Sequence, residues 1–331
     1  MSSLPKLSRR ALLATSTVGA GALALGLKPG EALSRNTDKV RLTFGPSGQL
    51  TQIAKDRGVL EKTLNDQGVK VEWIGPFPNH APTLQAVTGG SADFSFGGST
   101  TPALAAIAAG SPLVFTQFLI YRPRTTSIIA KDGSGIDKVE DLVGKSVAVN
   151  RSGLGEFLLV AALEKHGVDR SKVNVVYLNP PDAAPALASG KVDAWSMWSP
   201  GVDIARHEYK AHNVFFEETD LDFQIDFTTW LTSRKFASEN ADLVRLVNKA
   251  LKDEADWATA NPEDSEKIAQ GSPPRYVDAV RERFLTLKRA YEIYPVTDKA
   301  FVERLQKAAD WLVERKVLPE PVAITDLLAQ V

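Results

Sequence analysis

One segment of the chain occurs twice, and this internal repeat constrains the fold more than any other feature of the sequence. Residues 86–96 (AVTGGSADFSF) are matched by residues 186–196 (ALASGKVDAWS), with Gly90 aligned on Gly190 and an aspartate aligned three positions later. In each copy a helical stretch ends at the glycine, and a short strand then leads into a loop. Two copies are too few for a solenoid, which needs at least about three stacked repeats. The repeat therefore predicts two similar α/β lobes.

Short β-like runs alternate with helical runs from about Asp38 onward. Strands are predicted over residues 40–44 and 69–74, with one helix between them from about Leu50 to Leu64. Strands that are regularly separated by helices are typical of a mostly parallel, doubly wound sheet. The alternation therefore predicts an α/β fold.

A second element of the repeat and a helical tail complete the predicted organisation. The strand and loop of residues 41–49 recur at residues 146–155, which is a further sign of two related lobes. Beyond Trp230 the sequence is typical of helices, with apolar residues at helical spacing over residues 241–260. Thr297 is predicted to cap a last long helix. The buried stripe of that helix is predicted to be Phe301, Leu305, Ala308 and Leu312.

The composition excludes several classes of protein. The 331 residues carry 39 Lys and Arg against 40 Asp and Glu, whereas a nucleic-acid-binding protein needs a clustered basic excess to neutralise phosphates. The chain contains no cysteine, which excludes disulfides, thiolate zinc sites, cysteine nucleophiles and a lipidated cysteine anchor. The histidines are too few and too scattered for a metal site, and we expect neither a metal nor a cofactor. They are His80, His166, His207 and His212.

Residues 1–34 contain, in order, the three regions of an export signal. A short basic region around Arg9 and Arg10 is followed by an uncharged apolar run over residues 11–27 and by a small-residue cleavage site near Ala32. The arginine pair resembles the twin-arginine signal, which routes folded proteins out of the bacterial cytoplasm. A membrane anchor is the alternative, but the apolar run is shorter than the about 20 residues of a spanning helix. We expect a cleaved twin-arginine signal and a soluble, periplasmic protein that is not a lipoprotein.

No enzyme signature in the sequence is complete. Gly144-Lys145-Ser146 resembles the end of a phosphate-binding P-loop, but position 139 is Val where the leading Gly should be, and a strand follows instead of a helix. A glycine pattern at residues 19–24 mimics a dinucleotide-binding fingerprint but lies in the predicted export signal. The chain has neither a G-x-S-x-G elbow nor an H-E-x-x-H pair. We therefore expect a protein that is not an enzyme.

Three loops rich in Ser, Thr and Gly follow predicted strands and precede helical runs. A helix N-terminus presents free backbone N–H groups and a partial positive charge, and glycine lets a ligand approach closely. Three such loops at the same end of their strands would hold an oxyanion without any lysine. The alternative for each loop is that its serine only caps the following helix. The loop residues predicted to bind an anion are Ser47, Gly48, Gln49, Gly98, Ser99, Thr100, Ser152 and Gly153.

Four further side chains are candidates for the same site, and each has a structural alternative. Trp195 and Trp198 follow the second copy of the repeat and would wall a pocket for the apolar body of a ligand, although either residue is equally consistent with a core position. His80 follows the 69–74 strand and would either line the cleft or lie on the surface. Arg151 would pair directly with an anion, and its alternative is simple exposure to solvent.

Together these residues resemble the substrate-binding proteins of bacterial ABC importers, in particular the group that binds aliphatic sulfonates, taurine or nitrate. The similarity covers essentially the whole chain after the export signal. The motifs that carry it are GGSADF at 89–94 with TP at 101–102, LVGKSVAV at 142–149, and GKVDAW at 190–195 with Trp198 and Pro200. The resemblance implies the type II periplasmic binding fold, with two α/β lobes, a ligand cleft between them and a two-strand hinge.

The resemblance also implies how the chain divides and what it binds. The chain would cross between the lobes near residues 121–127 and 226–231. Lobe 1 would then combine residues 38–122 with 231–331, and lobe 2 would consist of residues 123–230. The implied ligand is a small organic anion, most simply an aliphatic sulfonate, which a monomeric receptor delivers to the permease of an ABC importer in the inner membrane.

Two departures from the family pattern bear on the ligand. The sulfonate-type proteins often carry an acid where this chain has Ser99, and Trp-Asp-Pro where it has Trp198-Ser199-Pro200. Acids in these loops would hold the ammonium group of a ligand. Their absence favours, as a hypothesis, a plain alkanesulfonate or another anion with a neutral or aromatic tail over taurine.

Three rival interpretations stay open. The same fold would also serve a receptor for a pyrimidine or thiamine precursor or for an aromatic carboxylate. Some proteins of this fold are enzymes that make a pyrimidine precursor, although the missing cysteine and the few histidines weigh against that activity here. A sensor domain would need a fused DNA-binding or membrane segment, and none is visible in the sequence.

Overall fold

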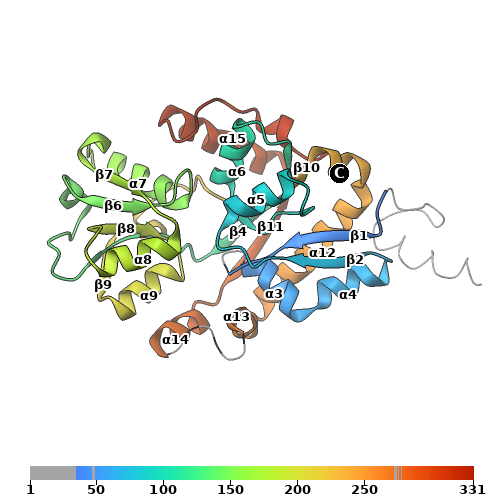
Figure 1. Cartoon of the computed structure of the whole chain (residues 1–331), viewed down its shortest axis with the longest axis horizontal. Helices are drawn as coiled ribbons and strands as arrows, with labels where there is room; N and C mark the ends of the chain where they lie inside the picture. Colours follow the sequence, from blue (N-terminus) through green and yellow to red (C-terminus); the bar gives the residue numbers. More distant parts are fainter. Residues whose placement is uncertain (1–34, 47–48, 272–273, 275, 277) are drawn as a thin grey trace, which may run out of the picture.

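The computed structural model describes residues 35–331 except 47–48, 272–273, 275 and 277. Two β-sheets with helices packed against them lie side by side along the long axis of the molecule (Figure 1). The predicted export signal lies outside the described residues. Within the described residues, no helix combines the length and the hydrophobicity that crossing a bilayer requires.

The first lobe contains a four-stranded sheet in the order β11-β4-β10-β3 and a neighbouring parallel pair, β1 and β2. Strand β4 runs antiparallel to both β10 and β11. Phe94 forms isolated bridges to Leu42 and Thr232 and so joins the pair to the larger sheet. The strands are β1 (Lys39–Thr43), β2 (Lys70–Ile74), β3 (Gly98–Ser99), β4 (Leu113–Arg122), β10 (Thr228–Ser233) and β11 (Ala290–Pro295).

Helices from both ends of the described chain cover this lobe. Leu243 and Val247 of the long helix after β10 are fully buried in one core with Val40, Ile53 and Leu64 from the start of the chain. The helices are α3 (Gln49–Arg57), α4 (Val59–Asp66), α5 (His80–Thr88), α6 (Thr100–Ala108), α11 (Arg234–Glu239), α12 (Ala241–Ala260), α13 (Pro262–Gln270), α14 (Asp278–Thr286), α15 (Lys299–Glu314) and the 3₁₀ turn η3 (Ile324–Leu327).

The second lobe contains a five-stranded sheet in the order β7-β6-β8-β5-β9. Strand β6 is parallel to β7 and β8, whereas β5 is antiparallel to β8 and β9. The strands are β5 (Ser127–Lys131), β6 (Ser146–Val149), β7 (Asn174–Tyr177), β8 (Ala194–Met197) and β9 (Ala211–Phe216). The helices are α7 (Leu154–Lys165), α8 (Pro180–Ala188), α9 (Gly201–Glu208) and α10 (Glu217–Asp220), with 3₁₀ turns η1 (Val139–Leu142) and η2 (Arg170–Lys172).

The sequence repeat corresponds to one structural device that is used in both lobes. In the first lobe the Asp93 carboxylate accepts a hydrogen bond of 2.7 Å from the backbone N–H of Arg41. In the second lobe the Asp193 carboxylate accepts one of the same length from the backbone N–H of Ser146. Each aspartate thereby fixes the segment after its helix to a strand of its own lobe, at the middle of β1 and at the start of β6. The predicted relation between the two halves is confirmed at these positions.

Several local predictions differ from the structure in instructive ways. The single helix predicted between Leu50 and Leu64 is two helices, because Gly58 adopts a left-handed conformation (φ 70°) between them. The last helix is capped by Asp298 instead of Thr297, since the Asp298 carboxylate accepts from the N–H of Phe301. The predicted helical tail contains strand β11, and the sheets are mixed because the strands next to the interlobe connections run antiparallel.

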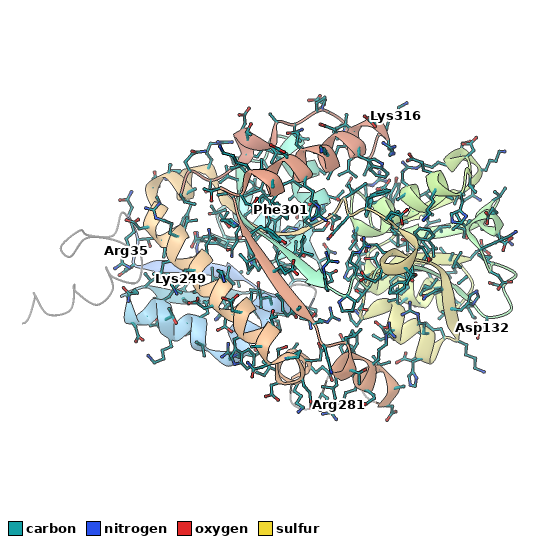
Figure 2. All side chains as sticks on the ribbon, turned by 180° about the vertical axis from the view of Figure 1, so that it is seen from behind. Arg35, Asp132, Lys249, Arg281, Phe301 and Lys316 are labelled. Atoms are coloured by element: carbon teal, nitrogen blue, oxygen red, sulfur yellow. The ribbon has the colours of Figure 1, made fainter. Side chains whose placement is uncertain are left out.

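The chain passes between the two sheets twice, from β4 to β5 and from β9 to β10. Arg124 joins the two connections, because its Nε donates to Glu218 Oε2 (3.1 Å) and its terminal nitrogens donate to the carbonyls of Leu221 and Phe223. Helix α14, below the sheets in Figure 1, packs against α9 of the second lobe. Figure 2 shows the same two-lobed body from behind.

Candidate functional site

A cleft between the lobes contains two adjoining chambers of about 280 Å³ and about 80 Å³. Both chambers are lined from the first lobe and from the second. Five residues line both of them, so the two chambers form one continuous site. These shared residues are Gly97, Leu119, Tyr121, Trp198 and Thr228.

The structure brings half of the predicted site residues to this cleft. His80, Gly98, Ser99 and Arg151 line the larger chamber, Gln49 lines the smaller one, and Trp198 lines both. Ser47 and Gly48 lie outside the described residues. Thr100, Ser152, Gly153 and Trp195 are described, but they do not line either chamber.

The four residues away from the cleft have structural contacts of their own. Trp195 is buried in the core of the second lobe with Ile129 and Val202. The Thr100 hydroxyl accepts a hydrogen bond of 3.0 Å from the N–H of Phe227. Trp195 therefore has the core position that was its alternative, whereas Thr100 does not cap α6 but binds the second connection.

Ser152 and Gly153, in the loop before α7, also contact their sequence neighbours and not the cleft. The backbone N–H of Ser152 (φ 51°) donates to Glu156 Oε2 at 2.7 Å. A Cβ on Gly153 would lie 1.5 Å from Asn150 Nδ2, so this glycine is needed for close packing within the loop. Arg151, between them, extends toward the larger chamber.

An acid from the second connection occupies the N-terminus of helix α6. Asp226 Oδ1 accepts hydrogen bonds from Ser99 Oγ (2.5 Å), Thr101 Oγ1 (2.7 Å) and the Thr101 N–H (2.9 Å). A fourth donor, Thr100 Oγ1, lies at 3.3 Å. The α6 loop was predicted to bind an oxyanion with these groups, and in the structure it binds the carboxylate of the chain itself. Burial raises the pKa of Asp226 above its ordinary value, although the hydrogen bonds from Ser99, Thr101 and Thr100 oppose this shift.

His80 forms part of the same wall. It is 5% exposed and stacks on Phe96 with 5.7 Å between the ring centroids. Its Nδ1 lies 2.9 Å from the carbonyl oxygen of Ser99. Its Nε2 has no hydrogen-bond partner among the described residues. Burial lowers the pKa of His80 to about 4, so the imidazole is neutral near pH 7.

The second-lobe wall of the larger chamber carries a positive charge and amide groups, in contrast to the first-lobe wall with Asp226 and the neutral His80. It is lined by Asn150, Arg151, Leu154 and Asn179, which lie at the N-termini of α7 and α8. The Arg151 guanidinium stacks on Tyr177, with Cζ 3.7 Å from the ring centroid. It has no carboxylate partner among the described residues, and its charge is therefore available to an anion.

The hinge contributes a third group of charges to the larger chamber. Glu217 and Arg124, one from each connection, both line it. The Glu217 carboxylate is 2% exposed and lies 3.5 Å from an Arg124 terminal nitrogen. Burial raises the pKa of Glu217 to about 7, although the guanidinium opposes this shift.

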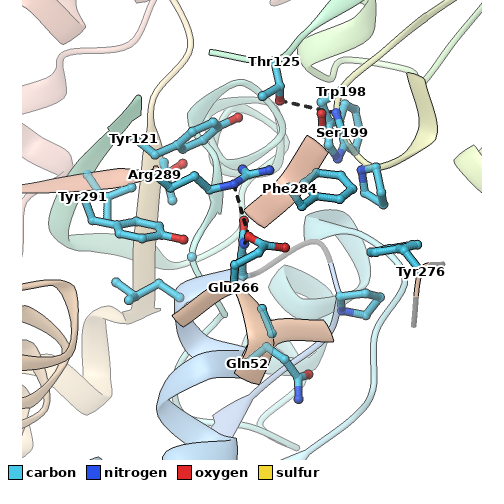
Figure 3. A pocket seen from close by; sticks show the side chains of 18 of the residues that line it. Gln52, Tyr121, Thr125, Trp198, Ser199, Glu266, Tyr276, Phe284, Arg289 and Tyr291 are labelled. Atoms are coloured by element: carbon cyan, nitrogen blue, oxygen red, sulfur yellow. Dashed lines mark hydrogen bonds and ion pairs between the residues drawn. The ribbon is translucent and has the colours of Figure 1, made fainter. Parts of the chain in front are cut away.

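The smaller chamber surrounds a buried arginine (Figure 3). Arg289 is 8% exposed, and its Nε lies 3.7 Å from Glu266 Oε2. Gln49 Nε2 donates to the same carboxylate oxygen at 2.8 Å, so the predicted ligand-binding amide is engaged within the protein. Tyr121 and Tyr291 stand on one side of Arg289, and burial raises the pKa of Tyr121 to about 12.

Sequence inspection missed five lining residues of this cleft with charged side chains. No motif surrounds them, and they come from the two connections, from α13 and from the residue before β11, which the sequence did not associate with the predicted loops. The only available signal was the implied position of the crossings, which placed Arg124 and Asp226 at lobe boundaries. The missed residues are Arg124, Glu217, Asp226, Glu266 and Arg289. Among the described residues, no group of three His, Asp or Glu side chains could hold a metal ion.

Comparison with known proteins agrees with this architecture. A family model described as NMT1/THI5 like matches residues 63–265, which is more than half of the chain, and the chain belongs to this family. The two-lobed periplasmic binding fold that the sequence implied is confirmed by solved structures.

Particular relatives point to one group of binding proteins. A relative in Escherichia coli (strain K12), whose name gives aliphatic sulfonates as its ligands, is 29% identical over 278 residues, 84% of this chain and 84% of the relative. The alkanesulfonate-binding protein SsuA from Xanthomonas axonopodis pv. citri, bound to MOPS, superposes with a TM-score of 0.79 at 25% identity, and the match covers 90% of this chain and 99% of that chain. The periplasmic aliphatic sulphonate binding protein SsuA from Escherichia coli has a TM-score of 0.75 at 25% identity, covering 89% and 98%. The resemblance stated from the motifs is confirmed.

Proposed function

We propose that this protein is the periplasmic solute-binding component of an ABC importer and that it binds a small aliphatic sulfonate. The observation that carries the proposal is the larger interlobe chamber, whose second-lobe wall presents the unpaired Arg151 guanidinium beside the N-terminus of α7. The names of the relatives, which include aliphatic sulfonates and alkanesulfonate, support the same ligand class.

The sulfonate group binds at the second-lobe wall. Arg151 provides the formal charge, and the amides of Asn150 and Asn179 provide further hydrogen-bond donors. The partial positive charge at the α7 N-terminus adds to this attraction. Trp198 lies against both chambers and packs on the carbon chain of the ligand.

Ligand binding closes the lobes. A ligand in the larger chamber touches both lobes at once, and it therefore stabilises the closed arrangement relative to an open one. The moving bodies are residues 38–122 with 231–331 and residues 123–230, which rotate about the two connections that Arg124 joins. The permease in the inner membrane then recognises the closed form.

The proposed function also includes export of the chain and release of the ligand in unchanged form. Residues 1–34 direct the chain through the twin-arginine route and are removed, which leaves a free periplasmic monomer without a lipid anchor. The protein binds its ligand and does not transform it, as the names of its relatives suggest.

Thermal unfolding of the purified protein tests the proposal. Propane-1-sulfonate, nitrate, benzoate and a thiamine-precursor pyrimidine are each titrated against the protein, and the ligand is recovered and analysed for turnover. A sulfonate at 100 times its dissociation constant adds about 2.7 kcal/mol to the free energy of unfolding. If the pyrimidine or benzoate alone raises the melting temperature, the sulfonate proposal is wrong, and a chemically altered ligand would identify an enzyme.

A further inference from the structure

The guanidinium of Arg151 lies over the ring of Tyr177, and the pairing of two strands brings these residues together. Strands β6 and β7 are parallel, with Val149 opposite Tyr177 at their carboxyl ends. Arg151 follows shortly after β6, and its Cζ lies 3.7 Å from the centroid of the tyrosine ring. A cation over the face of an aromatic ring is attracted to it, and the contact restricts a side chain that is otherwise long and flexible.

A buried carboxylate holds the ring of Tyr177 by its hydroxyl. This hydroxyl donates a hydrogen bond of 2.8 Å to Oε1 of Glu156, which lies in the first turn of α7 and is 5% exposed. Arg170 donates to the same oxygen at 2.7 Å, so a second residue also fixes the carboxylate. Burial and the hydrogen bond to Glu156 raise the pKa of Tyr177, and the phenol therefore keeps the proton that it donates.

The other oxygen of the same carboxylate holds the backbone beside Arg151. Glu156 Oε2 accepts a hydrogen bond of 2.7 Å from the N–H of Ser152, whose φ of 51° is uncommon for a residue other than glycine. The hydrogen bond stabilises this turn of the backbone directly after Arg151. Glu156 therefore fixes both the main chain next to Arg151 and the ring beneath its guanidinium.

Glu156 and Tyr177 are separate from the ligand chambers. Neither residue lines the larger or the smaller chamber, whereas Arg151 lines the larger one. Among the described residues, the contact with the Tyr177 ring is the one polar or cation–π contact of the Arg151 side chain. An effect of Glu156 or Tyr177 on a ligand in the chamber would therefore pass through the loop that carries Arg151.

We propose that Glu156 and Tyr177 are positioning residues, which hold the Arg151 guanidinium in the orientation in which it meets the sulfonate. This inference rests on the proposed function, because it requires an anion at Arg151. It adds two residues that do not contact the ligand to those that determine its affinity. An arginine that is ordered before the ligand arrives loses less conformational freedom on binding, and the affinity is correspondingly higher.

A double-mutant cycle on Arg151 and Tyr177 tests the inference, with propane-1-sulfonate as the ligand in calorimetry. Tyr177→Leu removes the ring, and we expect the affinity to fall about five- to tenfold. In an Arg151→Gln background the same substitution should leave the affinity unchanged, because no guanidinium remains to be positioned. Equal losses in the two backgrounds would mean that Tyr177 acts only on the shape or stability of the lobe, and they would overturn the inference.

A conservative variant of the tyrosine separates its ring from its hydroxyl. Tyr177→Phe keeps the ring over which Arg151 lies, and we expect a loss of only about two- to threefold. Tyr209→Leu, at the C-terminal end of α9 in the same lobe, is the control and should bind like the native protein. If Tyr177→Phe binds as weakly as Tyr177→Leu, the ring does not position Arg151 and the inference is wrong. If Tyr177→Leu does not fold, Tyr177→Phe completes the cycle with Arg151→Gln.

The carboxylate is tested by a change whose electrostatic effect has the opposite sign. Glu156→Gln removes a negative charge near the anion, and this alone would strengthen sulfonate binding. The variant also offers one acceptor oxygen to the three donors that Glu156 binds. We expect the affinity to fall about threefold or more in the native background and to stay unchanged or rise in the Arg151→Gln background. Stronger or unchanged binding in the native background would contradict a positioning role for Glu156.

The unaltered protein and the Arg151→Gln variant separate failure of this inference from failure of the proposed function. If propane-1-sulfonate does not bind the unaltered protein, the proposed function itself fails. If it binds both proteins equally well, the anion lies away from Arg151. The function then stands, and the inference is wrong.

Discussion

Ser99 and Asp226 are 127 residues apart in the chain, and a hydrogen bond of 2.5 Å joins Ser99 Oγ to Asp226 Oδ1. This contact connects the loop before α6 to the second interlobe connection. It explains why hydroxyl groups that resemble an oxyanion site do not face a ligand. The loop instead positions a carboxylate on one wall of the chamber, and the anion is left to the opposite wall.

Replacing Arg151 should weaken sulfonate binding without destabilising the protein. The guanidinium is exposed at the chamber and has no carboxylate partner among the described residues, so Arg151→Gln removes a contact that only the ligand makes. A hydrogen bond to a charged group corresponds to about 10- to 100-fold in affinity. Calorimetry measures the loss, and Lys191→Gln, on the exposed surface of the same lobe, is the control. Unchanged affinity for Arg151→Gln would place the anion elsewhere, with Arg289 as the next candidate.

The two tryptophans near the second repeat should respond differently to truncation. Trp195 is 2% exposed in the core, and Trp195→Ala should cost about 3–5 kcal/mol of the free energy of unfolding. Trp198 lines both chambers, and Trp198→Ala should mainly reduce ligand affinity. Denaturant unfolding and calorimetry on both variants test the contrast. Equal losses of stability with equal affinities would refute it.

Glu217 should make the protein less stable as the pH rises toward neutrality. Its pKa is raised from 4.5 to about 7 in the folded state, so between these values the folded protein holds a proton that the unfolded chain has released. Stability therefore falls with rising pH across this window. Glu217→Gln should remove this fall, so the variant should be more stable than the native protein at pH 8.

His80 contributes a slope of the opposite sign. Its pKa is lowered from 6.5 to about 4, so between these values the unfolded chain binds a proton that the folded protein does not, and stability rises with pH. The Glu217→Gln variant should therefore show a clear rise in melting temperature from pH 4 to pH 6.5. If the melting temperatures of the two proteins change in parallel from pH 4 to pH 8, Glu217 does not titrate in this range.

Helix α14 should stabilise the closed arrangement of the lobes. Arg283 Nε donates to the buried carboxylate of Asp203 at 2.5 Å, across the gap between α14 and α9. Arg283→Ala removes this interlobe ion pair, while Asp203 keeps Arg206 as a partner at 3.0 Å. We expect ligand affinity to fall about threefold, mainly through faster dissociation. Stopped-flow kinetics measures the rates, with Arg281→Ala on the same helix as the control. An unchanged dissociation rate would mean that this pair plays no part in closure.

The repeated and periodic parts of the fold could be predicted from the sequence. Asp93 and Asp193 stand at equivalent positions because each makes the same local hydrogen bond to the strand beside it. The apolar spacing over residues 241–260 gave helix α12 with its observed bounds, since one buried face is enough to define a helix. The buried stripe from Phe301 to Leu312 is confirmed for the same reason.

The charges of the site could not be predicted in the same way. Arg289 lies next to β11, a strand that was hidden in a segment of helical composition because its pairing with β4 joins distant parts of the chain. Asp226 acquires its role only when the second connection meets the α6 loop. A local pattern records the contacts a residue makes with its sequence neighbours, and these two residues act through distant ones.

The most direct test of this account is a crystal structure of the protein with propane-1-sulfonate. We predict that the ligand occupies the larger chamber, with its sulfonate within hydrogen-bond distance of the Arg151 guanidinium and its carbon chain against Trp198. A ligand bound in the smaller chamber against Arg289, or bound with its sulfonate toward Asp226, would contradict the account.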